Sequence, residues 1–288
     1  DSIVWSNFPK IYALFDKTAN EKLMPSINGR DEDKKGKTLE VSSLEEIKNK
    51  NLDVDLIIAK TDSLKREIYN YFVDAVQRAY DLTNDFSVVA LKARDGIKSL
   101  TRITIPLGKP VKVMLYQKAK DINDAFEIVG KPAAFEYKYD GFRLQIHKNN
   151  DKIKLFTRRL ENVTKQFPDA VNAAKKSIKM EKCILDCEVI GFEKKTGKWL
   201  PFQFISTRIK RKYDIEKVAN DFPVELNVFD IINYEGKSMI AEPFEERRKL
   251  LEKIIRKKAK LMTLSNIIIT SSEKEAEEFF RKSVSAGN

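Results

Sequence analysis

The sequence predicts an α+β protein in which a helical region precedes a region that mixes strands and helices. Between residues 64 and 82, apolar side chains recur at three- and four-residue spacing, which is typical of an amphipathic helix. Beyond residue 111, two segments of alternating polarity flank the turn Asn149-Asn150-Asp151 and predict a β-hairpin. Strands and helices then follow without regular alternation, which favours α+β over a doubly wound sheet.

Proline and glycine in the segment Pro106–Pro110 predict a linker between the two regions. We therefore expect a helical region over residues 1–108, in which 1–62 are not assigned, and a second domain over residues 109–288. Thr83 is expected to cap a second helix. The remaining patterns predict helices at 5–15, 44–50, 84–94, 164–179, 244–258 and 273–286, a charged loop at 29–37, and strands at 133–139, 142–147, 152–157, 183–192, 224–232 and 267–270.

Composition indicates a polyanion as a partner. The 288-residue chain is 42% hydrophobic, 34% charged and has a net charge of +11. Residues 1–110 contribute +1 of that charge and residues 111–288 contribute +10. Such an excess suits a phosphate backbone, although lysine-rich helix faces are also often only solvated. No run reaches the roughly eighteen apolar residues of a membrane span, and no signal peptide is visible in a chain that begins at Asp1.

Cys183 and Cys187 are expected to be reduced thiols rather than a metal site. The single His147 does not complete a zinc site with them unless carboxylates join in. Four residues apart in a strand, the two cysteines are also too distant to bridge easily. This pattern points to the cytosol.

The segment Glu136–Arg143 has the composition of a lysine nucleophile site. Lys138 lies among aromatic residues and just before the turn Asp140-Gly141. Because a lysine must lose its proton to attack, partial burial and nearby cations such as Arg143 favour that role. On composition alone, a strand with a surface lysine explains the segment equally well.

Lys138-Tyr-Asp-Gly-Phe-Arg143 resembles the K-x-D-G-x-R motif of ATP-dependent DNA ligases, RNA ligases and mRNA capping enzymes. Three further motifs follow in the order of that superfamily. Residues 156–162 resemble the segment with S/T-R, residues 185–190 resemble D-G-E-h-h, and residues 226–232 resemble h-x-h-F-D-h-h.

The resemblance is closer to the archaeal and eukaryotic replicative DNA ligases and covers about residues 63–288. The segments that carry it are Arg78–Asp85, Pro110–Leu115, Asn162–Asp169 and Pro201–Gln203. It implies an antiparallel-sheet adenylation domain, preceded by an all-helical remnant of a DNA-binding domain.

The resemblance implies that Lys138 attacks the α-phosphate of ATP and becomes a lysyl-AMP phosphoramidate. Arg143 and Arg158 would hold phosphate or ribose and later the 5′-phosphate of the nick, because the planar guanidinium grips oxyanions at two points.

The same resemblance assigns the adenosine contacts. Glu136 would lie against the adenine edge through its backbone, and Phe229 would stack on the adenine. Glu188 would bind a ribose hydroxyl or a metal-bound water. Mg²⁺ is implied by the chemistry, and it commonly needs only one or two carboxylates besides the substrate phosphates.

The sequence departs from the family pattern at two places. Cys187 stands where the family usually has glycine. At the other end, the family continues past residue 287 into an E-G-h-h-h-K motif, a lysine-rich strand and an OB domain. We therefore expect an adenylation domain that is incomplete at its C-terminus, with the OB domain absent.

The function expected from this resemblance is sealing of nicks in duplex DNA at the cost of ATP, in replication, repair and recombination. The alternatives are an RNA ligase or capping-type nucleotidyltransferase and a non-catalytic nucleic-acid-binding fragment. We expect a monomer in the cytoplasm, or in the nucleus if the source is eukaryotic. Binding to a sliding clamp is left open, and no membrane partner is expected.

Overall fold

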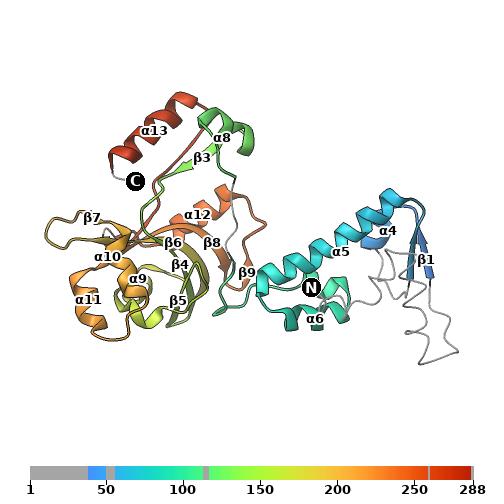
Figure 1. Ribbon diagram of the computed structural model, residues 1–288, viewed down its shortest axis with the longest axis horizontal. Helices are drawn as coiled ribbons and strands as arrows, with labels where there is room; N and C mark the ends of the chain where they lie inside the picture. Colours follow the sequence, from blue (N-terminus) through green and yellow to red (C-terminus); the bar gives the residue numbers. More distant parts are fainter. Residues whose placement is uncertain (1–37, 50–55, 113–116, 259, 287–288) are drawn as a thin grey trace. The chain divides into compact units, whose positions relative to one another are not determined.

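The chain divides into two compact units, Asp1–Thr104 and Ile105–Asn288. The computed structural model describes residues 38–49, 56–112, 117–258 and 260–286 (Figure 1). The division falls just before the segment in which proline and glycine predict a linker. The helix expected at 5–15 and the charged loop expected at 29–37 lie outside the described residues.

In its described residues, 38–49 and 56–104, the first unit combines helices with two short strands. Its elements are β1 (Thr38–Val41), α4 (Leu44–Asn49), β2 (Leu56–Ala59), α5 (Asp62–Thr83), α6 (Phe86–Arg94) and α7 (Ile97–Thr101). Strands β1 and β2 pair in parallel. The region expected to be wholly helical therefore also contains a two-stranded sheet.

Helix α5 forms where the apolar spacing predicts it. Thr61 caps its start, because its hydroxyl accepts a hydrogen bond from the Leu64 N–H at 3.2 Å. Helix α6 is capped by Asp85 rather than by Thr83, the residue expected from the sequence. The Asp85 carboxylate accepts hydrogen bonds from the N–H groups of Ser87 and Val88. The hydroxyl of Thr83 instead donates to the carbonyl of Ala79, one turn back in α5.

The second unit carries the remaining elements. Its helices are α8 (Ile122–Val129), α9 (Pro168–Ser177), α10 (Phe202–Ile209), α11 (Ile215–Asp221), α12 (Phe244–Ile254) and α13 (Glu273–Ser285), with a 3₁₀ turn η1 (Thr164–Gln166). Its strands are β3 (Ala133–Glu136), β4 (Phe142–Asn149), β5 (Lys152–Thr157), β6 (Lys182–Phe192), β7 (Trp199–Leu200), β8 (Val224–Tyr234), β9 (Lys237–Ser238), β10 (Met262–Leu264) and β11 (Ile267–Thr270).

A central sheet organises this unit. Within the described part of the chain it has seven strands, in the order β10-β8-β6-β4-β5, with β7 beside β6 and β9 beside β8. The neighbours are antiparallel, except that β10 runs parallel to β8. The predicted hairpin is the β4–β5 pair, and the α+β prediction with an antiparallel sheet is confirmed.

One face of the sheet is apolar and packs under α9 (Figure 1). Leu144 and Ile146 of β4 and Leu185 of β6 are fully buried there, together with Phe167 and Ala170 from the start of α9. Burying each large aliphatic side chain contributes about 1.5–3 kcal/mol. The alternation within β4 and β6 turns the intervening polar residues to the opposite face, which remains available for a site.

A buried arginine ties the helices of this layer to one another. Arg208 of α10 is 1% exposed and donates to both carboxylate oxygens of Asp169 at 2.9 and 2.6 Å. It also donates to the backbone carbonyls of Gln166 and Phe222, and it lies over the ring of Phe167. The buried charge is thus paired, as a buried ion requires.

Helices α8 and α13 pack together against a smaller sheet of β3 and β11 (Figure 1). Phe126 of α8, Ala133 of β3 and Ala276 of α13 form its core. Strand β3 ends at Glu136, so the strand expected over residues 133–139 is shorter than predicted. Lys138 consequently lies in the connection between β3 and β4 rather than in a strand.

Two of the predicted helices also differ in length. The helix expected over 164–179 begins as η1 and becomes α-helical only at Pro168, whose fixed φ suits a first helical position. The helix expected over 244–258 ends at Ile254. In the part of the chain that the structure describes, no helix is long and apolar enough to span a membrane.

Candidate functional site

Lys138 lies in a short connection that is anchored on both sides. The backbone N–H of Tyr137 donates to the carbonyl of Asn266 at 3.0 Å, and the hydroxyl of Tyr139 accepts from the N–H of Asn266 at 3.2 Å. Tyr139 is buried, whereas Lys138 is exposed. Its positive charge lies close enough to Glu188 to lower the pKa of that carboxyl. The amine is therefore held on a fixed backbone and beside a carboxylate.

Gly141 brings this connection against strand β6. A Cβ atom at this position would lie 2.2 Å from the carbonyl oxygen of Val189 and 3.1 Å from Cγ of Glu188. Because the first of these atoms is backbone, a side chain has no room unless the main chain moves. The glycine of the predicted motif is thus explained by close approach, which sets Lys138 beside Glu188.

Polar residues line the face of the sheet opposite the apolar core. Arg143, Gln145 and His147 alternate with core residues along β4, and Asp186 and Glu188 do the same along β6. In the β4–β6 register, Arg143 is opposite Glu188 and Gln145 is opposite Asp186. Charged groups of both signs therefore converge at the centre of the sheet, next to the Lys138 connection.

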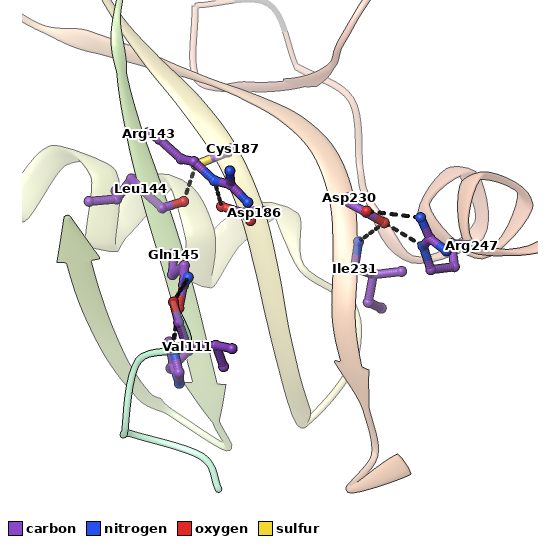
Figure 2. Close-up of polar contacts among 10 residues, drawn as sticks. Val111, Arg143, Leu144, Gln145, Asp186, Cys187, Asp230, Ile231 and Arg247 are labelled. Carbon is purple, nitrogen blue, oxygen red and sulfur yellow. Dashed lines mark hydrogen bonds and ion pairs between the residues drawn. The ribbon is translucent and has the colours of Figure 1, made fainter. Parts of the chain in front are cut away.

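Arg143 is paired with Asp186 through two hydrogen bonds (Figure 2). Its Nε donates to Oδ1 at 3.0 Å and its Nη2 donates to Oδ2. Burial alone lowers the pKa of Arg143, but the hydrogen bonds and charge of Asp186 outweigh it, so the net shift is upward. The pair fixes the guanidinium and leaves 30% of the side chain exposed to a ligand, while the carboxylate side chain keeps only 2%.

Phe229 lies against the same guanidinium. The Arg143 Cζ atom is 5.4 Å from the centroid of the Phe229 ring, a cation–π distance. Phe229 is partly exposed on β8, so it is not wholly committed to the core. Its neighbour Asp230 is held by Arg247 of α12 (Figure 2). An aromatic face and a guanidinium thus border the polar centre from the side of β8.

Glu188 is the carboxylate without a hydrogen-bond partner at this centre, as far as the described residues go. Burial raises its pKa to about 7, against the charges of Lys138 and Arg143, which lower it. An acceptor of this kind is suited to a hydroxyl group or to a metal-bound water. It could supply one of the one or two carboxylates that commonly hold Mg²⁺ beside substrate phosphates. No cluster of three metal-binding side chains occurs among the described residues.

Glu136 turns its side chain away from the centre. Its Oε1 accepts a hydrogen bond from the Ser265 hydroxyl at 2.7 Å and lies 3.8 Å from Nη1 of Arg248. Burial raises the pKa of this carboxyl, and the Ser265 hydrogen bond and Arg248 oppose the shift. The side chain is thus engaged within the protein, and contact of the Glu136 backbone with an adenine edge stays a prediction.

Arg158 is the predicted site residue that makes no contact with the others. It follows Thr157, the last strand residue of β5, which pairs with Leu144. Arg158 is exposed, and among the described residues no hydrogen bond or ion pair holds it. The structure therefore brings together Lys138, Glu188, Arg143 and Phe229. The Glu136 side chain is held by Ser265 instead, and Arg158 lies at the neighbouring strand end.

The cysteines are free thiols, as predicted, and both are buried. Both Cys183 and Cys187 are free, and burial raises the pKa of Cys183 to about 12 and that of Cys187 well above its usual range. The Cys187 thiol donates to the carbonyl of Leu144 at 3.3 Å. Its side chain points into the core, so the replacement of the family glycine does not obstruct Glu188.

Sequence reasoning missed three groups that hold the site together: Asp186, the pair Arg247 and Arg248, and Ser265. Asp186 lies within the motif at residues 185–190, but the motif gives it no role. Arginines in an amphipathic helix are expected to face water, whereas Arg248 is 8% exposed and both arginines bond to groups of the protein. A charged residue at a core position of the helical repeat was the signal that could have found Arg248.

Comparison with known proteins agrees with this arrangement. The family described as "ATP dependent DNA ligase domain" matches residues 113–288. The chain belongs to this family of ATP-dependent DNA ligases. The DNA ligase of Nanoarchaeum equitans is 47% identical over 215 residues, which cover 74% of this chain and 38% of that protein. The DNA ligase of Thermococcus onnurineus is 41% identical over 77% of this chain and 39% of its own length.

A third ligase matches a longer part of this chain. The DNA ligase of Methanopyrus kandleri is 36% identical over 270 residues, 93% of this chain and 47% of that protein. The chain thus spans less than half the length of these curated ligases. The matched residues include the whole site, so the predicted resemblance to archaeal-type DNA ligases is confirmed.

Proposed function

We propose that this chain carries the nucleotidyl-transfer site of a DNA ligase that seals nicks in duplex DNA with ATP. The single observation that supports this most is the placement of Lys138. It lies on an anchored connection beside Glu188, which is opposite Arg143 in the β4–β6 register, and Arg143 in turn contacts Phe229. A nucleophile, a phosphate-binding cation and an aromatic platform are the parts that adenylyl transfer requires.

In the first step, the neutral amine of Lys138 attacks the α-phosphorus of ATP. The new Nζ–P bond replaces the bond to pyrophosphate, which leaves with its electron pair, and the amine loses a proton. Arg143 would neutralise charge on the phosphate oxygens with the exposed part of its guanidinium. Asp186 keeps this guanidinium in one orientation, so little reorganisation is needed during the reaction.

Glu188 and Phe229 would hold the nucleoside part. Phe229 offers a face for the adenine, and the backbone at Glu136 would meet the purine edge. Glu188 would accept from a ribose hydroxyl or hold Mg²⁺ through a bound water. When bound, Mg²⁺ would supply charge neutralisation on the phosphate oxygens. Arg158 would join the site when nucleic acid supplies a second phosphate.

The later steps transfer AMP to DNA and seal the nick. An oxygen of the 5′-phosphate at the nick attacks the phosphorus of lysyl-AMP, and the Lys138 amine leaves and regains a proton, which gives DNA-adenylate. The 3′-hydroxyl then loses its proton and attacks the phosphorus of that 5′-phosphate, and AMP leaves. We propose that the helical residues of the first unit contribute to duplex binding, as the end of a DNA-binding domain within residues 1–108, of which 1–62 are not assigned. The same proposal includes a location in the cytoplasm, or in the nucleus of a eukaryotic source, and a monomeric state. Binding to a sliding clamp is left open.

The test is intact-protein mass after incubation with ATP and Mg²⁺. The wild-type chain should gain one AMP, and Lys138→Ala should gain none. Lys152→Ala removes an exposed lysine of β5 and serves as the matched control, which should label like wild type. Because the chain spans 38% of the Nanoarchaeum equitans ligase, the same three proteins are also made with the C-terminal part of that ligase appended. Absence of an adduct in both series would sink the proposal.

Two further comparisons separate the alternatives. Offering GTP in place of ATP tests a capping-type enzyme, which would label with GMP. Offering nicked RNA and nicked DNA duplexes to the extended protein tests an RNA ligase. Salt-sensitive DNA binding without any adduct would instead identify a non-catalytic binding module.

A further inference from the structure

A two-residue segment, Ser265-Asn266, holds both flanks of the Lys138 connection. Asn266 accepts from the N–H of Tyr137 through its carbonyl and donates its own N–H to the hydroxyl of Tyr139. The residues immediately before and after Lys138 are thus bonded to one partner. Any displacement of Asn266 would move Lys138 with it.

Ser265 connects the same segment to the strand that carries Phe229. Its N–H donates to the carbonyl of Val228 at 2.8 Å, one residue before Phe229. Its hydroxyl donates to Glu136 at 2.7 Å, at the end of β3. Ser265 is 2% exposed, so water does not replace these bonds. Ser265 therefore links the segment that carries Lys138 to the strand that carries Phe229, and it helps to set the distance between these two residues.

Arg248 of α12 holds Ser265 through two hydrogen bonds. Its Nη1 donates to the Ser265 hydroxyl at 3.0 Å, and its Nη2 donates to the Ser265 carbonyl at 2.8 Å. The nearest carboxylates are those of Glu136, at 3.8 Å from Nη1, and Glu252, at 3.7 Å from Nε. The planar guanidinium reaches hydroxyl and carbonyl at once, which a lysine ammonium on its flexible stem does not reproduce.

We propose that Arg248 is a positioning residue for adenylyl transfer. It touches neither the polar centre nor Lys138, and acts through Ser265 on the distance between Lys138 and Phe229. This inference rests on the proposed role of Lys138 as the nucleophile. A nucleotide stacked on Phe229 would still bind when the grip is loosened, but its α-phosphate would be misplaced relative to the amine. Displacement by about 1 Å is enough to slow a reaction by about 100-fold.

The experiment measures single-turnover formation of lysyl-AMP over a range of ATP concentrations, which separates the maximal rate from the apparent Kd for ATP. Arg248→Lys keeps the charge but loses the planar fork. We expect its maximal rate to fall at least about tenfold while the apparent Kd changes less than about threefold. Lys249→Ala, at the next and exposed position of α12, is the matched control and should keep both values.

A purely structural role for Arg248 predicts a different result. It would lower the melting temperature and the fraction of protein that can be labelled, but each folded molecule would react at the wild-type rate. The rate is therefore referred to the amplitude of labelling. A folded Arg248→Lys variant with the wild-type maximal rate would overturn the proposal.

Ser265→Ala keeps the inference testable if Arg248→Lys does not fold. It removes the bridging hydroxyl to Glu136 and leaves the hydrogen bond from Arg248 to the carbonyl of residue 265. The same split, a lower maximal rate with a nearly unchanged Kd, is expected, and a wild-type rate would count against the proposal. If wild type and Lys249→Ala both fail to label, in this chain and in the extended protein, the nucleophile assignment itself fails and this inference falls with it.

Discussion

Arg247 and Asp230 join α12 to β8 through two hydrogen bonds, from Nε to Oδ1 at 2.7 Å and from Nη2 to Oδ2 at 3.1 Å. The Asp230 carboxylate also accepts from the N–H of Ile231 at 2.8 Å (Figure 2). Because Asp230 directly follows Phe229, this pair fixes the backbone that carries the aromatic platform. Arg247 and Arg248, adjacent on one helix, therefore hold two different segments of the site.

Replacing Arg247 with methionine should loosen the platform. The two side chains are 17% and 29% exposed, so solvent screens the pair in part. Hydrogen bonds to charged groups contribute about 1.5–3 kcal/mol, and with this screening we expect a loss of about 1–2 kcal/mol in unfolding free energy. A double-mutant cycle with Asp230→Asn, measured by urea denaturation, should give a coupling of similar size. A coupling near zero would contradict the prediction, and Lys249→Met supplies the surface control.

Replacing Gly141 with alanine should abolish adenylyl transfer. The added Cβ would lie 2.2 Å from a backbone oxygen of β6, so the connection must move away from Glu188. Gly236→Ala is the control: its φ of +87° makes alanine strained, but an added Cβ there meets no atom within 4 Å. We expect the control to lose about 1 kcal/mol or more in stability and to label normally. Normal labelling of Gly141→Ala would show that the close approach has no role.

The carboxyl of Glu188 should titrate at about pH 7 in the free protein, because burial raises its pKa. The Lys138 charge opposes this shift, so Lys138→Ala should raise the pKa of Glu188 further, whereas Lys152→Ala should leave it in place. Carbon-13 NMR of the glutamate carboxyls measures both, with Glu188→Gln identifying the signal. A signal that titrates near 4.5 in wild type would contradict the burial of this group.

The Glu188 titration also has a consequence for stability. Since the folded pKa lies above the unfolded value of 4.5, the folded chain retains this proton at a pH where the unfolded chain has lost it. The contribution of Glu188 to the unfolding free energy is therefore greatest below about pH 4.5 and is lost as the pH rises through about 7. Glu188→Gln should show a flatter dependence than wild type across that window.

The sequence predicted the elements whose pattern is local. Alternation along β4 and β5 and the Asn149–Asp151 turn predicted the hairpin, and the apolar spacing predicted α5. The prediction of a strand through Lys138 was wrong beyond Glu136. Tyr137 and Tyr139 were interpreted as strand residues because they are aromatic, but they make tertiary contacts outside any strand. Their hydrogen bonds go to Asn266, more than 120 residues away, where no local pattern reveals them.

The motifs predicted the candidate site residues, but they did not predict the residues that hold these side chains in place. Lys138, Arg143, Glu188 and Phe229 were selected by the order and spacing of the motifs. The β4–β6 register explains why Arg143 and Glu188 meet, and the Arg143 guanidinium lies over the Phe229 ring of β8. Arg248 was missed because an arginine in an amphipathic helix usually faces water. The direction of its side chain depends on the packing of α12 near β8, which a single sequence does not show.

Gln145 should be necessary for docking the segment before the sheet onto β4. Its Oε1 accepts from the N–H of Val111 at 2.9 Å, and its Nε2 donates to the Val111 carbonyl at 2.6 Å (Figure 2). Gln145→Leu keeps the volume but leaves a buried donor and a buried acceptor without partners, which costs about 1–3 kcal/mol each. We expect faster hydrogen exchange at the Val111 amide and a lower melting temperature. Unchanged exchange in the variant would show that the backbone of Val111 finds other partners.

His147 should make the fold sensitive to acid. Its Nδ1 accepts from the N–H of Gly108 at 3.0 Å, its Nε2 lies 3.4 Å from Oε1 of Gln145, and the side chain is 2% exposed. Burial, helped by the charge of Lys154, lowers the pKa of His147 to about 4. A proton on Nδ1 would destroy the bond to Gly108, so the folded state keeps the neutral ring.

The sign of the effect follows from linkage. Between about pH 6.5 and 4, the imidazole is protonated in the unfolded chain but stays neutral in the folded chain. The unfolding free energy therefore decreases as the pH is lowered through this window. The loss approaches about 3 kcal/mol at its lower end, since one pKa unit corresponds to about 1.4 kcal/mol. Because the sequence has one histidine, no other imidazole contributes. His147→Asn keeps an acceptor for Gly108 and should be less sensitive to pH in urea denaturation from pH 7 to 4. Parallel profiles for the two proteins would show that the Gly108 bond does not constrain the ring.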